Sequence, residues 1–399
     1  MKHKLLWFLD SELKDDWGHY ANFAEKIIRE ARNQNLETIV AGNRNVTDSL
    51  GRRLSVRKAF HGMTHSFVPL GKVGALLSPV IGSGVHYREL SRWLPENGNG
   101  AIAFAATANH RHFPALAKWM SNFAAGAAPI LFVYLRFHFR DPVSNRPLPT
   151  APLVRRGLKL LEQAARTRPI ILISDSEQLA DEYRSITSLR IEVLPLPHMV
   201  PAQILANKHD KNGQSVCFSY FGEARLEKGY DLLVEALQRL QRIPEWRDVR
   251  FKVHSYHHPR YRMETWTEQL RGMPEVECIS EPMDSNSYYR MLLESDLILM
   301  PYRRSTYFAR SSGIFVDALA AGKPVIATQD TWMSEQLKHF GAGTLCRDSD
   351  SGDLARAMIE AKKSLPQMKE RASSGKQAWV EAHNTNLFLT SLVRIAEAS

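Results

Sequence analysis

Short apolar segments alternate with amphipathic segments along the whole chain. In the first half, apolar runs of strand length lie at 4–9, 37–41, 101–105, 130–135, 170–174 and 190–194. Helical periodicity, with apolar residues three or four positions apart, lies between several of them at 20–32, 114–123, 153–165 and 177–183. Strands that alternate with helices predict a mostly parallel sheet with helices on both faces.

The alternation stops near residue 200 and then starts again. Prolines between 195 and 201 and a polar stretch at 207–214 are typical of a linker. Further strands are predicted at 216–221, 249–253, 276–279, 297–300, 324–327 and 343–346. We therefore predict an α/β protein with two Rossmann-like domains, 1–199 and 200–380, and a ligand cleft facing the carboxyl ends of their strands. A C-terminal helix at 381–399 is expected to pack back on the first domain.

Composition favours a folded protein of the cytoplasm. The 399 residues are 44% hydrophobic and 24% charged, which suffices for sizeable cores. Cys217, Cys278 and Cys346 form no Cys-x-x-Cys pair, which argues against a structural zinc site and a disulfide framework. Charged residues interrupt the first apolar run early, unlike a signal peptide. The longest uncharged stretch, 119–135, contains glycine and proline, so we expect a helix end, a turn and a strand there.

Positive charge is concentrated in the first half of the chain. The net charge is +10, and 41–160 alone holds 16 Lys and Arg against 4 Asp and Glu, or +12. An anionic membrane surface, an acidic or phosphorylated substrate, nucleic acid or a simply solvated basic face would each explain this excess. We favour an acidic substrate or peripheral contact with an anionic membrane, and expect no nucleic-acid partner.

The first candidate site is the segment 220–231, between a predicted strand and a helix. Gly222 permits a tight turn at the strand end, and Arg225 and Lys228 stand near the helix start. Free N–H groups and the helix dipole already favour an anion there, so two cations make a diphosphate clamp. The alternative is an ordinary turn with solvated charges.

The second candidate site follows the predicted strand at 296–300. Ser311 or Ser312 would cap the next helix, and Gly313 would let a ligand approach its backbone. Asp317 lies one turn further on, where its oxygens would suit ribose hydroxyls. The alternative is a capped core helix on which Asp317 is merely exposed.

These two segments, in this order and about 90 residues apart, resemble the retaining GT-B glycosyltransferases, especially family 4, the group 1 glycosyl transferases. The matching residues are Gly222, 227–229, 231–233, 296–301 and 317–326. The resemblance covers roughly 215–346, and over the first domain only the βα rhythm matches. It implies a nucleotide-sugar donor on the second domain and an acceptor on the first.

The chain departs from the family pattern at two places. Glu223 stands where the family's phosphate-binding arginine usually follows the glycine, so we assign that role to Arg225. Of the family's pair of glutamates over the donor sugar, the second is Asp317 here and the first, near Arg310, is absent. Backbone N–H groups at 311–313 are expected to replace it.

The resemblance also implies site residues in the first domain. Gly18 and His19, after the first strand, match the family's glycine-containing loop and would face the acceptor. His138, after the strand at 130–135, is the candidate for the family's cleft histidine, with Arg136 as a rival. His110 stands at another strand end, where an acceptor would bind. Each histidine could equally be a satisfied surface or core imidazole.

We expect no metal site in this protein. Asp348 and Asp350 resemble a metal-binding pair, but they precede a helix at 352–362 and are better explained as its cap. The histidines at 254, 257 and 258 lack a second cluster of ligands.

The resemblance therefore implies a retaining hexosyltransferase that serves polysaccharide synthesis, and because fixed cations can replace a metal we expect it to need neither metal nor cofactor. Arg225 and Lys228 would stabilise the departing diphosphate, with His138 as the third catalytic residue, Asp317 on the ribose and the loops 254–258 and 281–284 beside the base. The acceptor would be a glycan or a lipid-linked group. The alternatives are a nucleotide-sugar epimerase of the same fold, and a non-catalytic sugar- or nucleic-acid-binding α/β protein.

Overall fold

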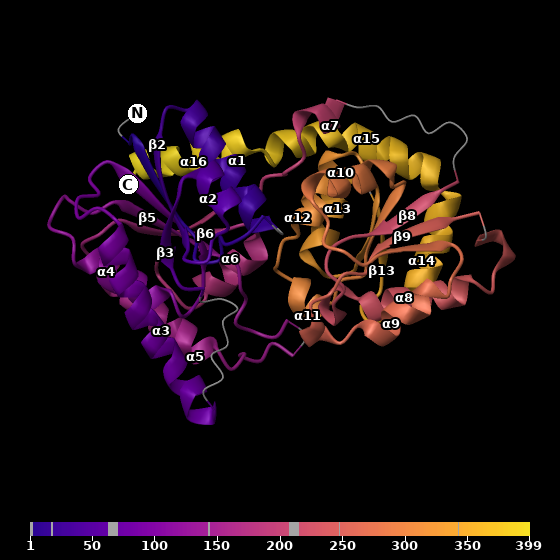
Figure 1. The fold of residues 1–399 in the computed structure, drawn as a ribbon, viewed down its shortest axis with the longest axis horizontal. Helices are drawn as coiled ribbons and strands as arrows, with labels where there is room; N and C mark the ends of the chain where they lie inside the picture. The colour runs from indigo at the N-terminus through magenta and orange to yellow at the C-terminus, as the bar shows by residue number, and fades with distance from the viewer. Residues whose placement is uncertain are drawn as a thin grey trace. The chain divides into compact units, whose positions relative to one another are not determined.

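The computed structural model divides the chain into two compact units, shown in Figure 1. Unit 1 comprises Met1–Pro197 and Thr385–Ser399, and unit 2 comprises His198–Asn384. The structure describes residues 3–16, 19–62, 71–142, 144–206, 215–246, 248–341 and 343–399. The last helix of the chain thus belongs to the first unit by its contacts.

Unit 1 is built on a seven-stranded parallel sheet of order β3-β2-β1-β4-β5-β6-β7. Its strands are β1 (Leu5–Leu9), β2 (Glu37–Asn43), β3 (Val56–Phe60), β4 (Ala101–Ala108), β5 (Ile130–Leu135), β6 (Ile170–Ser174) and β7 (Ile191–Val193). The strand order reverses between β1 and β4. Ligands of open parallel sheets bind at the carboxyl ends of the strands beside such a reversal.

Helices cover both faces of this sheet. Neighbouring residues of a strand point to opposite faces, so each strand supplies apolar side chains to the helices on both sides. Trp7 contacts Trp119 of α4, whereas Phe8 contacts Phe23 of α1. On the α1 side, Phe388 of α16 packs against Phe23 as well, and α16 lies along α1 in Figure 1. The helices are α1 (His19–Asn33), α2 (Asp48–Leu54), α3 (Gly71–Trp93), α4 (Phe113–Ser121), α5 (Ala151–Ala165), α6 (Glu177–Arg184) and α16 (Thr385–Glu397).

Unit 2 repeats this architecture with a six-stranded parallel sheet of order β10-β9-β8-β11-β12-β13. Its strands are β8 (Cys217–Tyr220), β9 (Arg250–His254), β10 (Val276–Ile279), β11 (Leu297–Met300), β12 (Val325–Thr328) and β13 (Gly343–Cys346). The strand order reverses between β8 and β11. The candidate donor residues follow these two strands in the sequence.

Several helices of unit 2 pack on one another. Helix α8 packs on α9 and α14, and α15 packs on α12 and α13. The helices are α7 (Ala202–Ala206), α8 (Tyr230–Leu240), α9 (Glu264–Arg271), α10 (Ser285–Glu294), α11 (Arg304–Tyr307), α12 (Gly313–Ala320), α13 (Trp332–Phe340), α14 (Ser351–Lys363) and α15 (Leu365–Ala382), with 3-10 turns η1 (Leu226–Lys228), η2 (Pro244–Trp246) and η3 (Pro259–Tyr261).

The structure confirms the predicted fold class of two parallel α/β sheets. Every predicted strand is present within a few residues, and 119–135 is the end of α4, a turn and β5. The sequence analysis missed β3 and α3, and the polar part of the expected linker, 207–214, lies outside the described residues. Within the described part of the chain, no helix combines the length and the apolar character that crossing a membrane requires.

Candidate functional site

The loop after β8 and the start of α12 meet at the strand reversal of unit 2. Gly222 has a positive φ of 89°, a conformation that glycine adopts without strain. A Cβ on Gly222 would collide with Nζ of Lys228 and lie 2.9 Å from Cδ1 of Ile314, in the first turn of α12. The absence of a side chain at Gly222 therefore lets Lys228 and α12 approach the strand end.

Gly229 brings the next part of the loop against the end of β11. It caps η1 with φ 67°, and a Cβ here would collide with the carbonyl oxygen of Pro301. The close approach explains why the loop needs glycine directly after Lys228.

Arg225 is enclosed by carboxylates. Its Nε and Nη2 donate to Oε2 of Glu223, the former at 2.8 Å, and its Nη1 donates to Oε1 of Glu227 at 3.2 Å. Its guanidinium also lies 4.8 Å from the ring centroid of Tyr261. Burial alone would lower the pKa of Arg225, but Glu223 and the other charges raise it. A diphosphate that engages Arg225 must share it with Glu223 or displace that carboxylate.

Lys228 lies deeper in the same loop. Burial and the positive charges of Arg225 and Arg310 lower the pKa of Lys228 to about 7, against the opposing effect of Glu227. Its Nζ lies 5.8 Å from the ring centroid of Tyr302, which follows β11. The amine is thus poised to gain a proton when an anion arrives.

The N-terminus of α12 borders this group of cations. Ser312 is its N-cap, and its Oγ accepts from the N–H of Phe315 at 3.4 Å. Ser311 is buried, and a Cβ on Gly313 would meet no described atom within 4 Å. Open space therefore lies in front of the backbone of Gly313, as approach of a ligand requires.

Asp317 is buried on α12, 6% exposed, rather than merely lying on the surface. Its Oδ1 accepts from the N–H of Met199 at 2.6 Å, and its Oδ2 accepts from the hydroxyl of Tyr288 at 3.2 Å. Met199 and Tyr288 are neighbours of the candidate ribose site that the sequence did not indicate.

The carboxyl ends of the unit 1 strands gather a second set of polar side chains. Asp10, after β1, is 1% exposed; its Oδ1 accepts from the N–H of Glu12 at 2.9 Å and its Oδ2 from the hydroxyl of Thr107 at 3.3 Å. Burial raises the pKa of Asp10 to about 7. Beside it, Oγ of Ser11 lies 3.1 Å from Nε2 of His112, which joins the β1 and β4 loops across the strand reversal.

Of the acceptor-side candidates, Arg136 belongs to this set. Its guanidinium lies 5.1 Å from the ring centroid of Tyr134. Burial alone would lower the pKa of Arg136, but the surrounding tyrosines and the carboxylates Asp175 and Asp10 raise it.

The remaining acceptor-side candidates are His110, His138, Gly18 and His19. His110 is half-buried, and burial together with Arg111 lowers its pKa to about 4, so it is neutral at physiological pH. His138 is half-buried in the loop after β5. Gly18 lies outside the described residues, and His19 is the first residue of α1.

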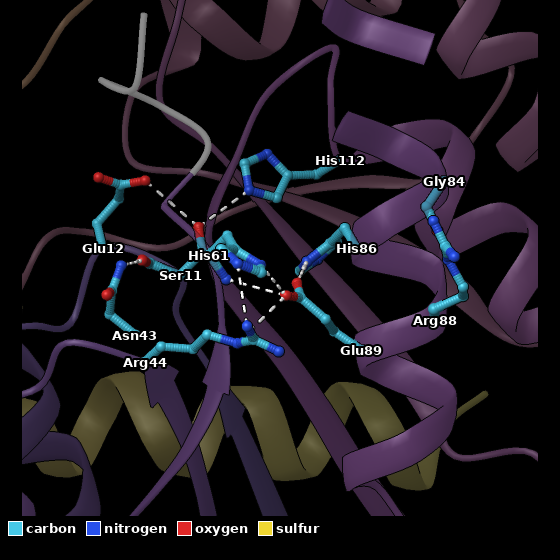
Figure 2. Close-up of polar contacts among 10 residues, drawn as sticks. All are labelled: Ser11, Glu12, Asn43, Arg44, His61, Gly84, His86, Arg88, Glu89 and His112. Carbon is cyan, nitrogen blue, oxygen red and sulfur yellow. Dashed lines mark hydrogen bonds and ion pairs between the residues drawn. The ribbon is translucent and has the colours of Figure 1, made fainter. Parts of the chain in front are cut away.

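A buried carboxylate extends this polar edge to β2 and β3. Figure 2 shows Glu89 of α3 facing Arg44 and His61, which follow β2 and β3. Oε1 of Glu89 accepts from Nδ1 of His61 at 2.5 Å, and Nδ1 of His86 lies 3.7 Å from its Oε2. Burial would raise the pKa of Glu89, but the hydrogen bond from His61 and the nearby ring of His86 lower it, so this carboxylate carries its charge within unit 1.

Of the two aspartates that resemble a metal-binding pair, Asp350 caps α14, whereas Asp348 binds the backbone at the start of α11. Oδ1 of Asp350 accepts from the N–H of Asp353 at 2.8 Å at the start of α14, and Oδ1 of Asp348 accepts from the N–H of Arg304 at 3.1 Å. Among the described residues no group of three His, Cys, Asp or Glu is arranged to hold a metal ion.

Unit 2 matches a known protein family. A family model for glycosyl transferases group 1 matches residues 202–378, nearly all of this unit. Residues 202–378 form a group 1 glycosyltransferase domain. A search of curated proteins finds no match to this chain.

Solved glycosyltransferase structures share the fold over the full length. A glycosyltransferase from Rickettsia africae is 13% identical with a TM-score of 0.68, covering 99% of this chain and 98% of its own. Anabaena HepE in complex with UDP and glucose is 14% identical with a TM-score of 0.65, covering 100% of both chains. Sucrose-phosphate synthase from Thermosynechococcus elongatus is 12% identical with a TM-score of 0.69, covering 99% of both. These likenesses confirm the expected GT-B fold.

The group 1 domain contains further candidate residues that sequence reasoning missed. Arg310 lies 4.0 Å from Oε1 of Glu227 and so joins the cations beside Lys228. Tyr302 and Tyr288 border the same region from β11 and α10. In unit 1, Asp10 carried a usable signal, because it is an acidic residue directly after a buried strand.

Proposed function

We propose that this glycosyltransferase transfers a hexose from a nucleoside diphosphate sugar, with UDP as the first candidate carrier, and retains the anomeric configuration. The observation that carries the donor proposal is the meeting of Gly222, Lys228 and the first turn of α12 at the strand reversal. Three cations, an open helix N-terminus and a buried aspartate within one loop system suit a nucleoside diphosphate. HepE is a relative in fold whose structure contains UDP and glucose, which supports UDP.

The proposed chemistry uses fixed positive charge. As the bond from the sugar carbon to the diphosphate breaks, negative charge grows on the leaving diphosphate. Arg225, Lys228 and the N–H groups at 311–313 stabilise this charge more in the transition state than in the ground state. Because protein cations take this role, we propose that transfer needs no divalent metal. Retention of configuration rests on the family resemblance.

We propose that unit 1 binds an acidic acceptor, either a glycan or a lipid-linked group, in polysaccharide synthesis at the cytoplasmic face of a membrane. The net charge of +12 over 41–160 supports this proposal, and Arg136 at the carboxyl ends of the strands supplies a fixed cation. Co-sedimentation with liposomes checks the membrane part. Binding that does not respond to the fraction of anionic lipid would contradict it.

Calorimetric titration tests the donor site. UDP, GDP, ADP, dTDP and CMP are titrated into the wild type and into an Arg225→Ala/Lys228→Ala variant. We expect one diphosphate to bind tightly to the wild type and at least tenfold more weakly to the variant. Absence of binding by every nucleotide would overturn the proposed function.

A further inference from the structure

His254 ends β9 at the point where three loops of unit 2 come together. The N–H of Ala224 donates to the carbonyl of Tyr256 at 2.7 Å, which joins the β8 loop to the β9 loop. The N–H of Ser255 donates to the carbonyl of Ile279 at 2.9 Å, which joins the β9 loop to the end of β10. The loops after β8, β9 and β10 are therefore joined to one another next to His254, and the β8 loop contains the candidate cations Arg225 and Lys228.

The hydrogen bond to Glu281 fixes the tautomer of His254. Nε2 lies 3.1 Å from the carbonyl oxygen of Glu281, which can only accept, so Nε2 carries the hydrogen. Burial, with the charge of Lys228, lowers the pKa of His254 to about 4, against the effects of Glu281 and Glu223. The imidazole is neutral at physiological pH, and Nδ1 is a bare acceptor.

Nδ1 of His254 is a buried acceptor that no described residue of the protein satisfies. The side chain is 7% exposed, and its ring lies nearly parallel to that of Tyr256, at 18° with centroids 6.1 Å apart. Leaving a buried acceptor without a donor is costly, so native structures rarely do so unless a ligand or a water supplies the donor. Glu223, which accepts from Nε of Arg225 at 2.8 Å, also accepts from the N–H of His258 at 3.0 Å, so the loop after His254 is hydrogen-bonded directly to the diphosphate clamp.

We propose that Nδ1 of His254 accepts a hydrogen bond from the nucleoside part of the donor, either an N–H of the base or a hydroxyl of the ribose. This inference rests on the proposed function, because it assigns a selectivity residue to the same donor site. The neutral imidazole discriminates by requiring a hydrogen at this position, and a nucleoside that lacks it leaves the acceptor unsatisfied. His254 thus selects the nucleoside, whereas the cations bind the diphosphate.

Two substitutions separate the two nitrogens of the ring. In His254→Gln the side-chain amide reaches the position of Nε2 and can still donate to the carbonyl of Glu281, but nothing replaces Nδ1. In His254→Asn the shorter amide places an oxygen near Nδ1 and gives up the bond to Glu281. Binding that depends on Nδ1 is therefore weakened more by glutamine than by asparagine. His339→Gln, an exposed histidine in the last turn of α13, is the matched control.

The experiment is calorimetric titration of UDP, 3-methyl-UDP, 2′-deoxy-UDP and 3′-deoxy-UDP, or of GDP and its analogues if the nucleotide panel selects GDP. We expect His254→Gln to weaken UDP binding about tenfold to a hundredfold, and His339→Gln to leave it unchanged. One analogue should bind the wild type more weakly than UDP does, by a similar factor. Its affinity should then not fall further in His254→Gln. That analogue names the donating group.

Three outcomes separate the failure of this inference from failure of the proposed function. Equal UDP affinity of the wild type and His254→Gln overturns the inference alone, and a buried water then satisfies Nδ1. The inference is also overturned if each analogue loses the same factor of affinity, relative to UDP, in the wild type and in His254→Gln. The imidazole then contacts no hydrogen of the nucleoside. If the wild type binds no nucleotide, the proposed donor site falls together with the inference.

Discussion

Lys228 has a low pKa and is one of the residues proposed to bind the diphosphate. Its pKa of about 7 in the ligand-free protein means that the amine is half neutral near physiological pH. A bound diphosphate favours the ammonium form, so binding raises this pKa and takes up a proton. We expect UDP affinity to fall as the pH rises from about 7 to about 9, where the phosphates themselves no longer titrate. Calorimetry in two buffers of different ionisation enthalpy measures the uptake.

Lys228→Arg is the control for this pH dependence. Arginine stays charged throughout the range, so its UDP affinity should change little with pH, even if its fit is poorer. An equally steep decline in wild type and Lys228→Arg would assign the titration to another group.

Asp10 is a buried carboxyl group whose ionisation opposes folding of unit 1. Its pKa is 3.8 unperturbed and about 7 in the folded protein, so its protonated form contributes stability that is complete below about pH 4 and lost as the pH rises through about 7. In Asp10→Asn the amide oxygen can accept from Glu12 and the amide can donate to Thr107. Because each pKa unit is worth about 1.4 kcal/mol, we expect Asp10→Asn to stabilise unit 1 by a few kcal/mol at pH 8.

Hydrogen exchange of peptides from β1 and β4 at pH 4 and pH 8 measures this effect. The variant should be protected more than the wild type at pH 8 and about equally at pH 4. A loss of protection at pH 8 would show that the ionised carboxylate supports the fold.

The donor residues differ in how far the sequence could predict their surroundings. Gly222 and Lys228 lie in one short loop, so their proximity followed from the motif. The pairing of Arg225 with Glu223 and Glu227 was also local, yet which pairs form depends on side-chain directions that a sequence does not give. Asp317 contacts Met199 and Tyr288, 118 and 29 positions away, and such partners follow only from the tertiary fold.

The loop of η1 illustrates how an element depends on one glycine. Gly229 and Gly341 both have φ near +65°, but a Cβ at Gly229 meets Pro301 whereas one at Gly341 meets no described atom. We expect Gly341→Ala to cost about 1 kcal/mol for its backbone conformation alone. Gly229→Ala should cost more, because the loop must also move away from β11, and it should weaken UDP binding.

Urea unfolding and UDP titration of the two glycine variants check this difference. Equal losses of stability, with equal UDP affinity, would mean that the loop yields without disturbing the clamp.

The sequence predicts the buried strands more readily than the exposed elements. The central strands are continuous apolar runs, such as 130–135, and β5 is fully buried as its sequence implies. Strand β3 lies at the edge of its sheet and contains Arg57 and Lys58, so it lacks that signature. Helix α3 contains several glycines and a proline, and its apolar residues do not recur at helical spacing. Its sequence therefore did not predict a helix.

At the scale of the whole molecule, the chain forms most of unit 1, then unit 2, and contributes one more helix to unit 1. The return segment is α16, whose Phe388 is 2% exposed and packs against Phe23, Phe104 and Tyr134 of unit 1. The core of the first unit is therefore complete only when α16 is in place. A lesion in the final helix should act on the first unit and spare the second.

Phe388→Ala tests this division against its neighbour in the helix, Leu387→Ala. Loss of a buried phenylalanine costs about 3–5 kcal/mol, whereas Leu387 is 43% exposed and its truncation should cost well under half as much. We expect faster hydrogen exchange in β1, β4 and β5 of Phe388→Ala, with UDP affinity within about twofold of the wild type, because unit 2 keeps its own core. If exchange quickens equally in β8 and β11, the two units share one cooperative transition, and the last helix stabilises both.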